Sequence, residues 1–178
     1  MAFGLIDETG TLEYGQIFFQ YSQMSPDGHI TEKTTILEGD VMVTKFPCLQ
    51  PGDVRKLRAI RVNGLCHIKD CIVFPSRGER PHPDEMGGSD LDGDEYAVFW
   101  DTPLMFPCEN VKSMIFPYGM SAAQSTDITL NDLVEFYCNF LLQNNIGQVA
   151  NTHLMFSDYL TRGLFTAECH NLAVMYSI

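Results

Sequence analysis

The sequence has few basic residues, no long apolar run and no internal repeat. Its 11 Lys and Arg stand against 23 Asp and Glu, and the resulting net charge of −12 argues against a protein whose whole surface binds nucleic acid. No apolar run reaches the roughly 18 residues of a membrane span, and residues 1–4 lack the positive charge that begins a signal peptide. With 45% hydrophobic and 19% charged residues, the composition is that of a globular protein rather than a disordered one.

Cysteine pairs with the Cys-x-x-Cys spacing of a zinc knuckle are also missing. The cysteines lie mostly among apolar neighbours, which predicts reduced, buried thiols in an intracellular protein. No targeting signal among these residues distinguishes cytoplasm from nucleus. The six cysteines are Cys48, Cys66, Cys71, Cys108, Cys138 and Cys169.

Many short strands with irregular connections are the main pattern before residue 125. Apolar or alternating runs predict strands over 3–6, 14–21, 40–45, 58–62, 70–74 and 96–100. A helical turn is expected over 54–57, and loops over 25–33, 46–53 and 76–86, which are rich in proline, glycine or polar residues. Because strands and helices do not alternate regularly, we expect a small closed barrel rather than a doubly wound sheet.

The composition changes after about residue 125, and residues 126–178 are expected to be helical. Thr129 and Asp132 have the spacing of a helix-capping pair. Further helices are expected over 146–160 and 167–178, and the last of these ends without polar capping residues, as if truncated. Apolar residues at helical spacing follow Thr129 on one face, namely Leu130, Leu133, Val134, Phe136, Tyr137, Phe140 and Leu141.

The most informative stretch is an acidic run in which Asp90, Asp92 and Asp94 alternate with other residues. Carboxylates this close repel one another and raise each other's pKa. A divalent cation removes that penalty, and Mg²⁺ and Mn²⁺ prefer such oxygen ligands. Gly88 precedes the run, and Gly93 within it can adopt a conformation that other residues avoid and leaves room for a phosphate. The run therefore predicts a site for Mg²⁺, with Mn²⁺ as a possible substitute.

Three other interpretations of the run are possible. An EF-hand loop needs Gly at its sixth position and Glu at its twelfth, but counting from Asp90 these positions hold Glu95 and Asp101. A phosphatase with an aspartate nucleophile normally places its Asp-x-Asp-Gly run after a buried apolar strand, which residues 83–88 cannot form. The third interpretation, a solvated acidic turn, is less favoured because two glycines precede the carboxylates and an apolar strand follows them.

Basic residues are concentrated immediately before the acidic run. Eight of the eleven lie between Lys45 and Arg80, against three acidic residues, which leaves a net charge of about +5 in this segment. A basic segment beside a metal-binding turn suits an anionic substrate such as a nucleotide or a polynucleotide. An ordinary solvated face explains the charge alone equally well.

Four segments taken together carry a family resemblance: 43–55, 70–75, 78–83 and 88–94. They closely resemble the eukaryotic cellular RNA-dependent RNA polymerases of RNA silencing. Residues 3–10 and 146–153 are also similar to segments of that family. The resemblance extends over nearly the whole chain, with several motifs in the same order.

The resemblance implies an α+β, mainly β fold, with a double-psi β-barrel catalytic module over 1–125 and C-terminal helices over 126–178. It also implies that Asp90, Asp92 and Asp94 bind catalytic Mg²⁺ for nucleotidyl transfer from ribonucleoside triphosphates. The template would be single-stranded RNA, the product double-stranded or small RNA for silencing, and the further partners other silencing proteins, with no membrane involved.

Other residues have less specific expected roles. Lys45, Arg55 and Arg80 are candidates to contact nucleotide phosphates or RNA, with surface ion pairs or loop anchoring as the alternative. His82 and His153 are expected to be structural, and Asp101 is a weaker candidate for a carboxylate that supports the triad. Tyr96 and Trp100 are expected to pack the barrel, with stacking on a base as the alternative.

Members of the family are much longer and carry a second barrel upstream, with basic residues that face the same cleft. We therefore expect this chain to hold the metal-binding triad without a complete active site and to be inactive alone. The alternative is a non-catalytic metal- or RNA-binding module derived from the same family.

Overall fold

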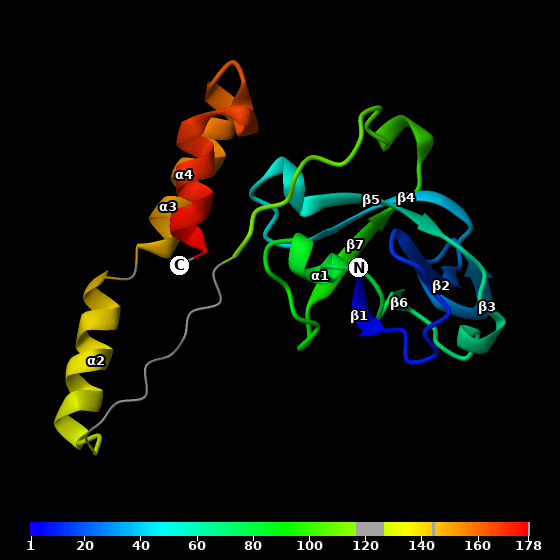
Figure 1. Cartoon of the computed structure of the whole chain (residues 1–178), viewed down its shortest axis with the longest axis horizontal. Coiled ribbons are helices and arrows are strands. Elements are labelled where there is room, and N and C mark those ends of the chain that lie inside the picture. The colour runs from blue at the N-terminus through cyan, green and yellow to red at the C-terminus, as the bar shows by residue number, and fades with distance from the viewer. Residues whose placement is uncertain (117–126, 144, 178) are drawn as a thin grey trace. The chain divides into compact units, whose positions relative to one another are not determined.

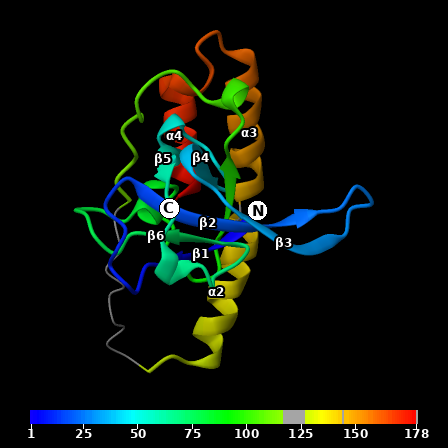
Figure 2. The same cartoon turned by 90° about the vertical axis from the view of Figure 1, so that its right-hand side faces the viewer.

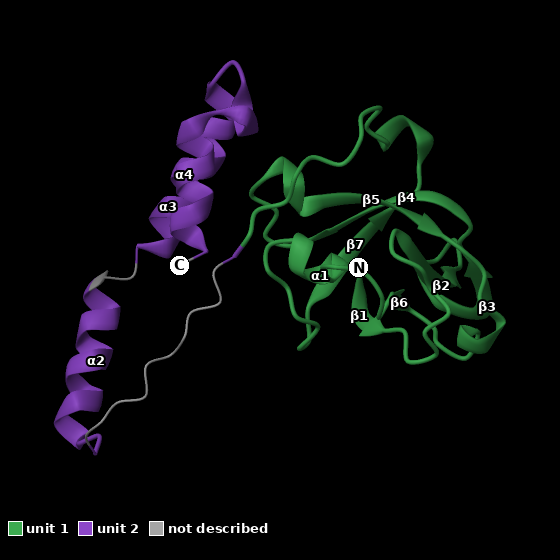
Figure 3. Ribbon diagram, in the orientation of Figure 1, with its two compact units in different colours: residues 1–115 green, residues 116–178 purple. Residues whose placement is uncertain are grey.

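A computed structural model of the protein describes residues 1–116, 127–143 and 145–177. The chain forms two compact units, residues 1–115 and residues 116–178 (Figure 3). The change of composition near residue 125 lies within 117–126, outside the described residues. No helix in the described part of the chain combines the length and the apolar character needed to cross a membrane.

The first unit is a mixed six-stranded β-barrel (Figure 1). Around the ring the order is β2–β5–β4–β7–β1–β6, and β6 pairs with β2 to close it. The β1–β6 and β2–β5 pairs are parallel, and β3 extends β2 as a hairpin outside the ring (Figure 2). The strands are β1 (Ala2–Ile6), β2 (Gln16–Met24), β3 (Ile30–Ile36), β4 (Gly39–Lys45), β5 (Val54–Ala59), β6 (Cys71–Phe74) and β7 (Glu95–Phe99).

Two apolar clusters explain why some strands are apolar on both faces. In β2, Ile17 and Phe19 belong to the larger cluster, in which residues of β1, β4, β5, β6 and β7 also pack. Phe18 points to the opposite face, where Leu65 and other residues of the segment after β5 cover it. Because successive side chains of a strand alternate between faces, an unbroken apolar run indicates a strand that is covered on both sides.

The closed barrel is confirmed, and so are the strands predicted around β1, β2, β4, β6 and β7. The helical turn predicted over 54–57 is wrong, because these residues begin β5 and pair with β4, for example Arg55 with Val43. The strand predicted over 58–62 correspondingly ends at Ala59. The loop predicted up to residue 33 is also partly wrong, because β3 already begins at Ile30.

The loop predicted over 76–86 contains a short helix, α1 (His82–Glu85). Pro83 stands in its first turn, where a missing backbone N–H is tolerated. The burial predicted for the cysteines is right for Cys169 and wrong for Cys108 and Cys138, which are exposed.

The second unit contains the helices α2 (Leu130–Gln143), α3 (Ile146–Tyr159) and α4 (Ala167–Tyr176). The predicted capping pair is confirmed, because Thr129 N donates to the Asp132 carboxylate at 2.8 Å and Thr129 Oγ1 accepts from Asp132 N at 3.3 Å. The helices α3 and α4 lie side by side. The apolar face predicted for α2 is exposed, with Phe136 71% and Leu130 76% accessible.

Candidate metal centre

The three aspartates of the acidic run come together just before β7. One side-chain oxygen from each of Asp90, Asp92 and Asp94 lies within 4.8 Å of the other two. Asp90 and Asp92 are exposed, and Asp94 is half-buried. Oxygen atoms at this spacing can ligate a single divalent cation. Within the described ranges, no other group of three acidic, histidine or cysteine side chains is gathered in this way.

Leu91 explains why the carboxylates alternate with other residues. Its side chain packs against the barrel core above Gly4, where a β-carbon would lie 2.5 Å from Leu91 Cδ2 and from Tyr96 Cε2. The aspartates on either side of Leu91 therefore stay at the surface. The turn also has positive φ at Leu91 (70°) and at Gly93 (129°). Glycine adopts such an angle without a steric penalty, whereas Leu91 is strained at its angle.

Ser89 links the triad to the core of the barrel. It is only 2% exposed, and its hydroxyl contacts both Asp94 Oδ2 and the Tyr96 hydroxyl. Tyr96 is fully buried, as predicted, and packs edge-on against Phe74, with the ring centroids 5.0 Å apart. Burial raises the pKa of Tyr96 to about 12, so Tyr96 stays a neutral hydroxyl at physiological pH. Sequence reasoning missed Ser89, and its only signal was a small hydroxyl residue directly before the carboxylates.

Lys45, at the end of β4, contacts the triad. Its Nζ lies 2.7 Å from Asp94 Oδ1. Burial alone would raise the pKa of Asp94, but hydrogen bonds from Lys45 and Ser89 outweigh burial and lower it. The neighbouring charge of Asp90 instead raises the pKa of Asp92. Asp92 thus retains the repulsion that a bound cation would relieve, whereas Asp94 is already compensated.

The other two candidate arginines contact the protein itself. Arg55 is buried, and one of its terminal nitrogens donates to Val111 O at 2.7 Å. Arg80 pairs with Asp84 and donates to Ser113 Oγ at 2.8 Å. These contacts correspond to loop anchoring, the alternative that the sequence left open.

The remaining candidates lie apart from the triad. Trp100 follows the far end of β7 and stacks on Tyr21, with the ring centroids 5.2 Å apart, and Asp101 beside it is exposed. His82 and His153 are buried, in the first and the second unit respectively. Buried positions suit the structural role expected for both histidines.

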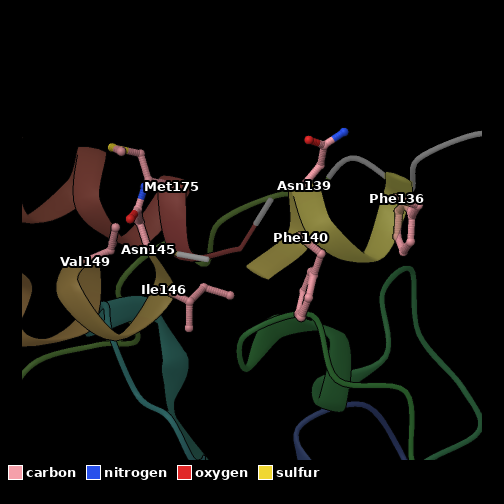
Figure 4. A pocket seen from close by; sticks show the side chains of 7 residues that line it. All are labelled: Phe136, Asn139, Phe140, Asn145, Ile146, Val149 and Met175. Carbon is pink, nitrogen blue, oxygen red and sulfur yellow. The ribbon is translucent and has the colours of Figure 1, made fainter. Parts of the chain in front are cut away.

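The second unit has a cavity of about 480 Å³. Figure 4 shows that side chains of α2, α3 and α4 surround it. None of its lining residues is ionisable, so it offers no acid, base or charged metal ligand. The lining residues are Phe136, Asn139, Phe140, Asn145, Ile146, Val149 and Met175.

Comparison with known proteins identifies the family. The sequence model of the family described as RNA dependent RNA polymerase matches residues 1–178. RNA-dependent RNA polymerase 1 of Arabidopsis thaliana is 41% identical over 174 residues, which cover 98% of this chain and 15% of the relative. RNA-dependent RNA polymerase 1 of Schizosaccharomyces pombe is 33% identical over 195 residues, covering 98% and 16%.

A solved structure shares the fold. The RNA dependent RNA polymerase QDE-1 from Thielavia terrestris superposes with a TM-score of 0.74 at 24% identity, covering 99% of this chain and 21% of that one. The chain spans about one sixth of the length of the two curated relatives named above. Because the family model matches its whole length, this chain belongs to the RNA-dependent RNA polymerase family.

Proposed function

We propose that this chain is part of the catalytic core of an RNA-dependent RNA polymerase, in which Asp90, Asp92 and Asp94 bind Mg²⁺ or Mn²⁺. The observation that carries the proposal is the convergence of three carboxylate oxygens within 4.8 Å in a chain of this family. The three carboxylates suit Mg²⁺ or Mn²⁺, because hard divalent cations favour clustered carboxylate oxygens that are open to water and to substrate phosphates. The reaction is nucleotidyl transfer from ribonucleoside triphosphates on a single-stranded RNA template, and its role is double-stranded or small RNA synthesis in silencing.

The residues of this chain have separable tasks in the proposed reaction. When bound, divalent ions stabilise the attacking 3′-oxygen and the leaving pyrophosphate by their charge. Ser89 fixes the orientation of Asp94 through its hydroxyl, which limits how far the carboxylate must move when a cation binds. The Lys45 ammonium, 2.7 Å from Asp94 Oδ1, is placed to interact with substrate phosphates arriving at the same carboxylates.

The barrel is proposed to be of the double-psi type, supported by its two parallel strand pairs in a closed six-stranded ring. Residues 1–125 would then form the catalytic module and residues 126–178 the helical segment that follows it. Other RNA-silencing proteins are the proposed further partners. We propose that these residues have no activity alone, because they span only 15% and 16% of the two curated relatives named above.

A chimera tests the proposed activity. Residues 1–178 replace the matching segment of the Arabidopsis thaliana relative, and RNA synthesis is measured with a single-stranded template and the four triphosphates. We expect product from the chimera and none from its Asp92→Asn form, whereas Asp101→Asn, which removes an equal charge outside the triad, leaves synthesis intact.

The alternative function, a non-catalytic metal- or RNA-binding module of the same family, predicts a different result from the same proteins. A folded chimera that makes no RNA while residues 1–178 still bind Mn²⁺ through Asp92 would favour the alternative. Synthesis that survives Asp92→Asn would contradict a catalytic role for the triad altogether.

A further inference from the structure

Glu85, at the end of α1, is a buried carboxylate that the proposed reaction does not use. It is 5% exposed. Its Oε1 accepts from the Tyr14 hydroxyl at 2.7 Å, and its Oε2 from His82 Nδ1 at 2.6 Å. Arg55 Nε lies 3.4 Å from Oε2 and forms an ion pair rather than a hydrogen bond. Both oxygens of Glu85 thus accept a hydrogen bond, and its negative charge is paired with the positive charge of Arg55.

The ring of His82 connects Glu85 to the start of β2. Its Nε2 accepts a hydrogen bond from Gly15 N at 2.8 Å, so the proton of the neutral ring is on Nδ1 and is donated to Glu85. The Tyr14 ring lies against the His82 ring, with centroids 4.2 Å apart. One carboxylate therefore fixes α1 to residues about 70 positions earlier in the chain.

Two glycines, Gly87 and Gly88, separate two anchored residues between Glu85 and the triad. Met86 is fully buried in the barrel core, and Ser89 is held by its contacts to Asp94 and Tyr96. Between them Gly87 and Gly88 adopt φ of 68° and 72°. Because glycines have more accessible conformations than other residues, the path of this segment depends on the anchors on either side and on α1, where Asp84 O accepts from Gly88 N at 3.2 Å.

We propose that Glu85 is a positioning residue for the metal-binding turn. It acts through α1 and Met86, and its loss lets the two glycines adopt other conformations, so that the three carboxylates no longer converge. Burial alone would raise the pKa of Glu85, but hydrogen bonds from His82 and Tyr14 outweigh burial and lower it, in agreement with a charged anchor. This inference rests on the proposed metal-binding function of the triad.

The test is Mn²⁺ binding to the 178-residue chain, measured by calorimetry, with the number of Mn²⁺-bound waters measured by proton relaxation. Glu85→Gln keeps the shape of the side chain and removes its charge, and we expect about tenfold weaker binding and more bound water, as for changes to residues that orient metal ligands. Glu79→Gln is the matched control, an exposed residue of the same loop, and should bind as the unchanged chain does. A merely structural role would lower the unfolding temperature without changing Mn²⁺ binding by the folded protein.

Asp92→Asn separates this inference from the proposed function. If Asp92→Asn abolishes binding and folded Glu85→Gln binds normally, the positioning role is wrong and the metal site stands. If neither substitution changes binding, both are wrong.

A second variant keeps the test decisive if Glu85→Gln does not fold. Tyr14→Phe removes one hydrogen bond to Glu85 and keeps the ring that contacts His82. We expect about two- to threefold weaker Mn²⁺ binding, corresponding to part of one hydrogen bond. Unchanged affinity in folded Tyr14→Phe would overturn the positioning role.

Discussion

Replacing Lys45 with methionine is expected to tighten Mn²⁺ binding, although Lys45 is a candidate substrate ligand. A cation that binds the triad competes with the ammonium for Asp94 Oδ1, 2.7 Å from Nζ, and is repelled by its charge. The two side chains are 22% and 16% exposed, so we take the upper end of the range for surface pairs, about 1 kcal/mol. Since about 1.4 kcal/mol corresponds to a factor of ten, Lys45→Met should tighten binding about fivefold.

Calorimetric Mn²⁺ titration of the chain measures this change directly. Lys33→Met is the matched control, because it removes the same charge from β3, outside the barrel ring. The metal-free Lys45→Met protein should also be less stable to urea by up to about 1 kcal/mol, a loss that saturating Mn²⁺ reverses. Weaker Mn²⁺ binding in Lys45→Met would refute the reasoning, because Lys45 would then orient Asp94 more than it competes with the cation.

Two further predictions concern stability. Gly93→Ala places a β-carbon at a φ of 129° with nothing within 4 Å, so backbone strain alone should lower the free energy of unfolding by about 1–2 kcal/mol. Gly147→Ala, at an open position of α3, should not lower it, and equal urea midpoints for the two variants would contradict this. Because the pKa of Glu85 is lowered from its ordinary 4.5, its contribution to stability is complete above that value and is lost as pH falls through the lower folded pKa. Glu85→Gln should flatten this acid dependence in urea unfolding as the pH falls below about 5. Glu79→Gln should not, and an unchanged slope in Glu85→Gln would argue against the ionised anchor.

The barrel was predictable where a strand shows its own pattern. The apolar run of β2 and the aromatic run of β7 indicate strands without any knowledge of their partners. Val54–Leu57 does not, because the charges of Arg55 and Lys56 suit a surface helix, and only pairing with β4 makes the segment a strand. Tertiary pairing outweighed local preference at this position.

The triad was predictable from local sequence because its three carboxylates lie within five residues. Its supports were not predictable, since Glu85 contacts Tyr14 across 71 positions and Arg55 across 30 positions. Arg55 and Arg80 also show that a cluster of basic residues does not by itself reveal which side chains face a substrate. Several of their partners lie in residues 111–114, a segment that shows no local pattern in the sequence.

Mn²⁺ binding to the chain and to its Asp92→Asn variant tests the central claim most directly. Asp101→Asn removes an equal charge outside the triad and serves as the control. We expect the unchanged chain and Asp101→Asn to bind Mn²⁺ with the same affinity. Asp92→Asn should lose most of that affinity, because the Asp92 carboxylate converges with those of Asp90 and Asp94. Equal binding by all three proteins would mean that the acidic turn is not a preformed metal site.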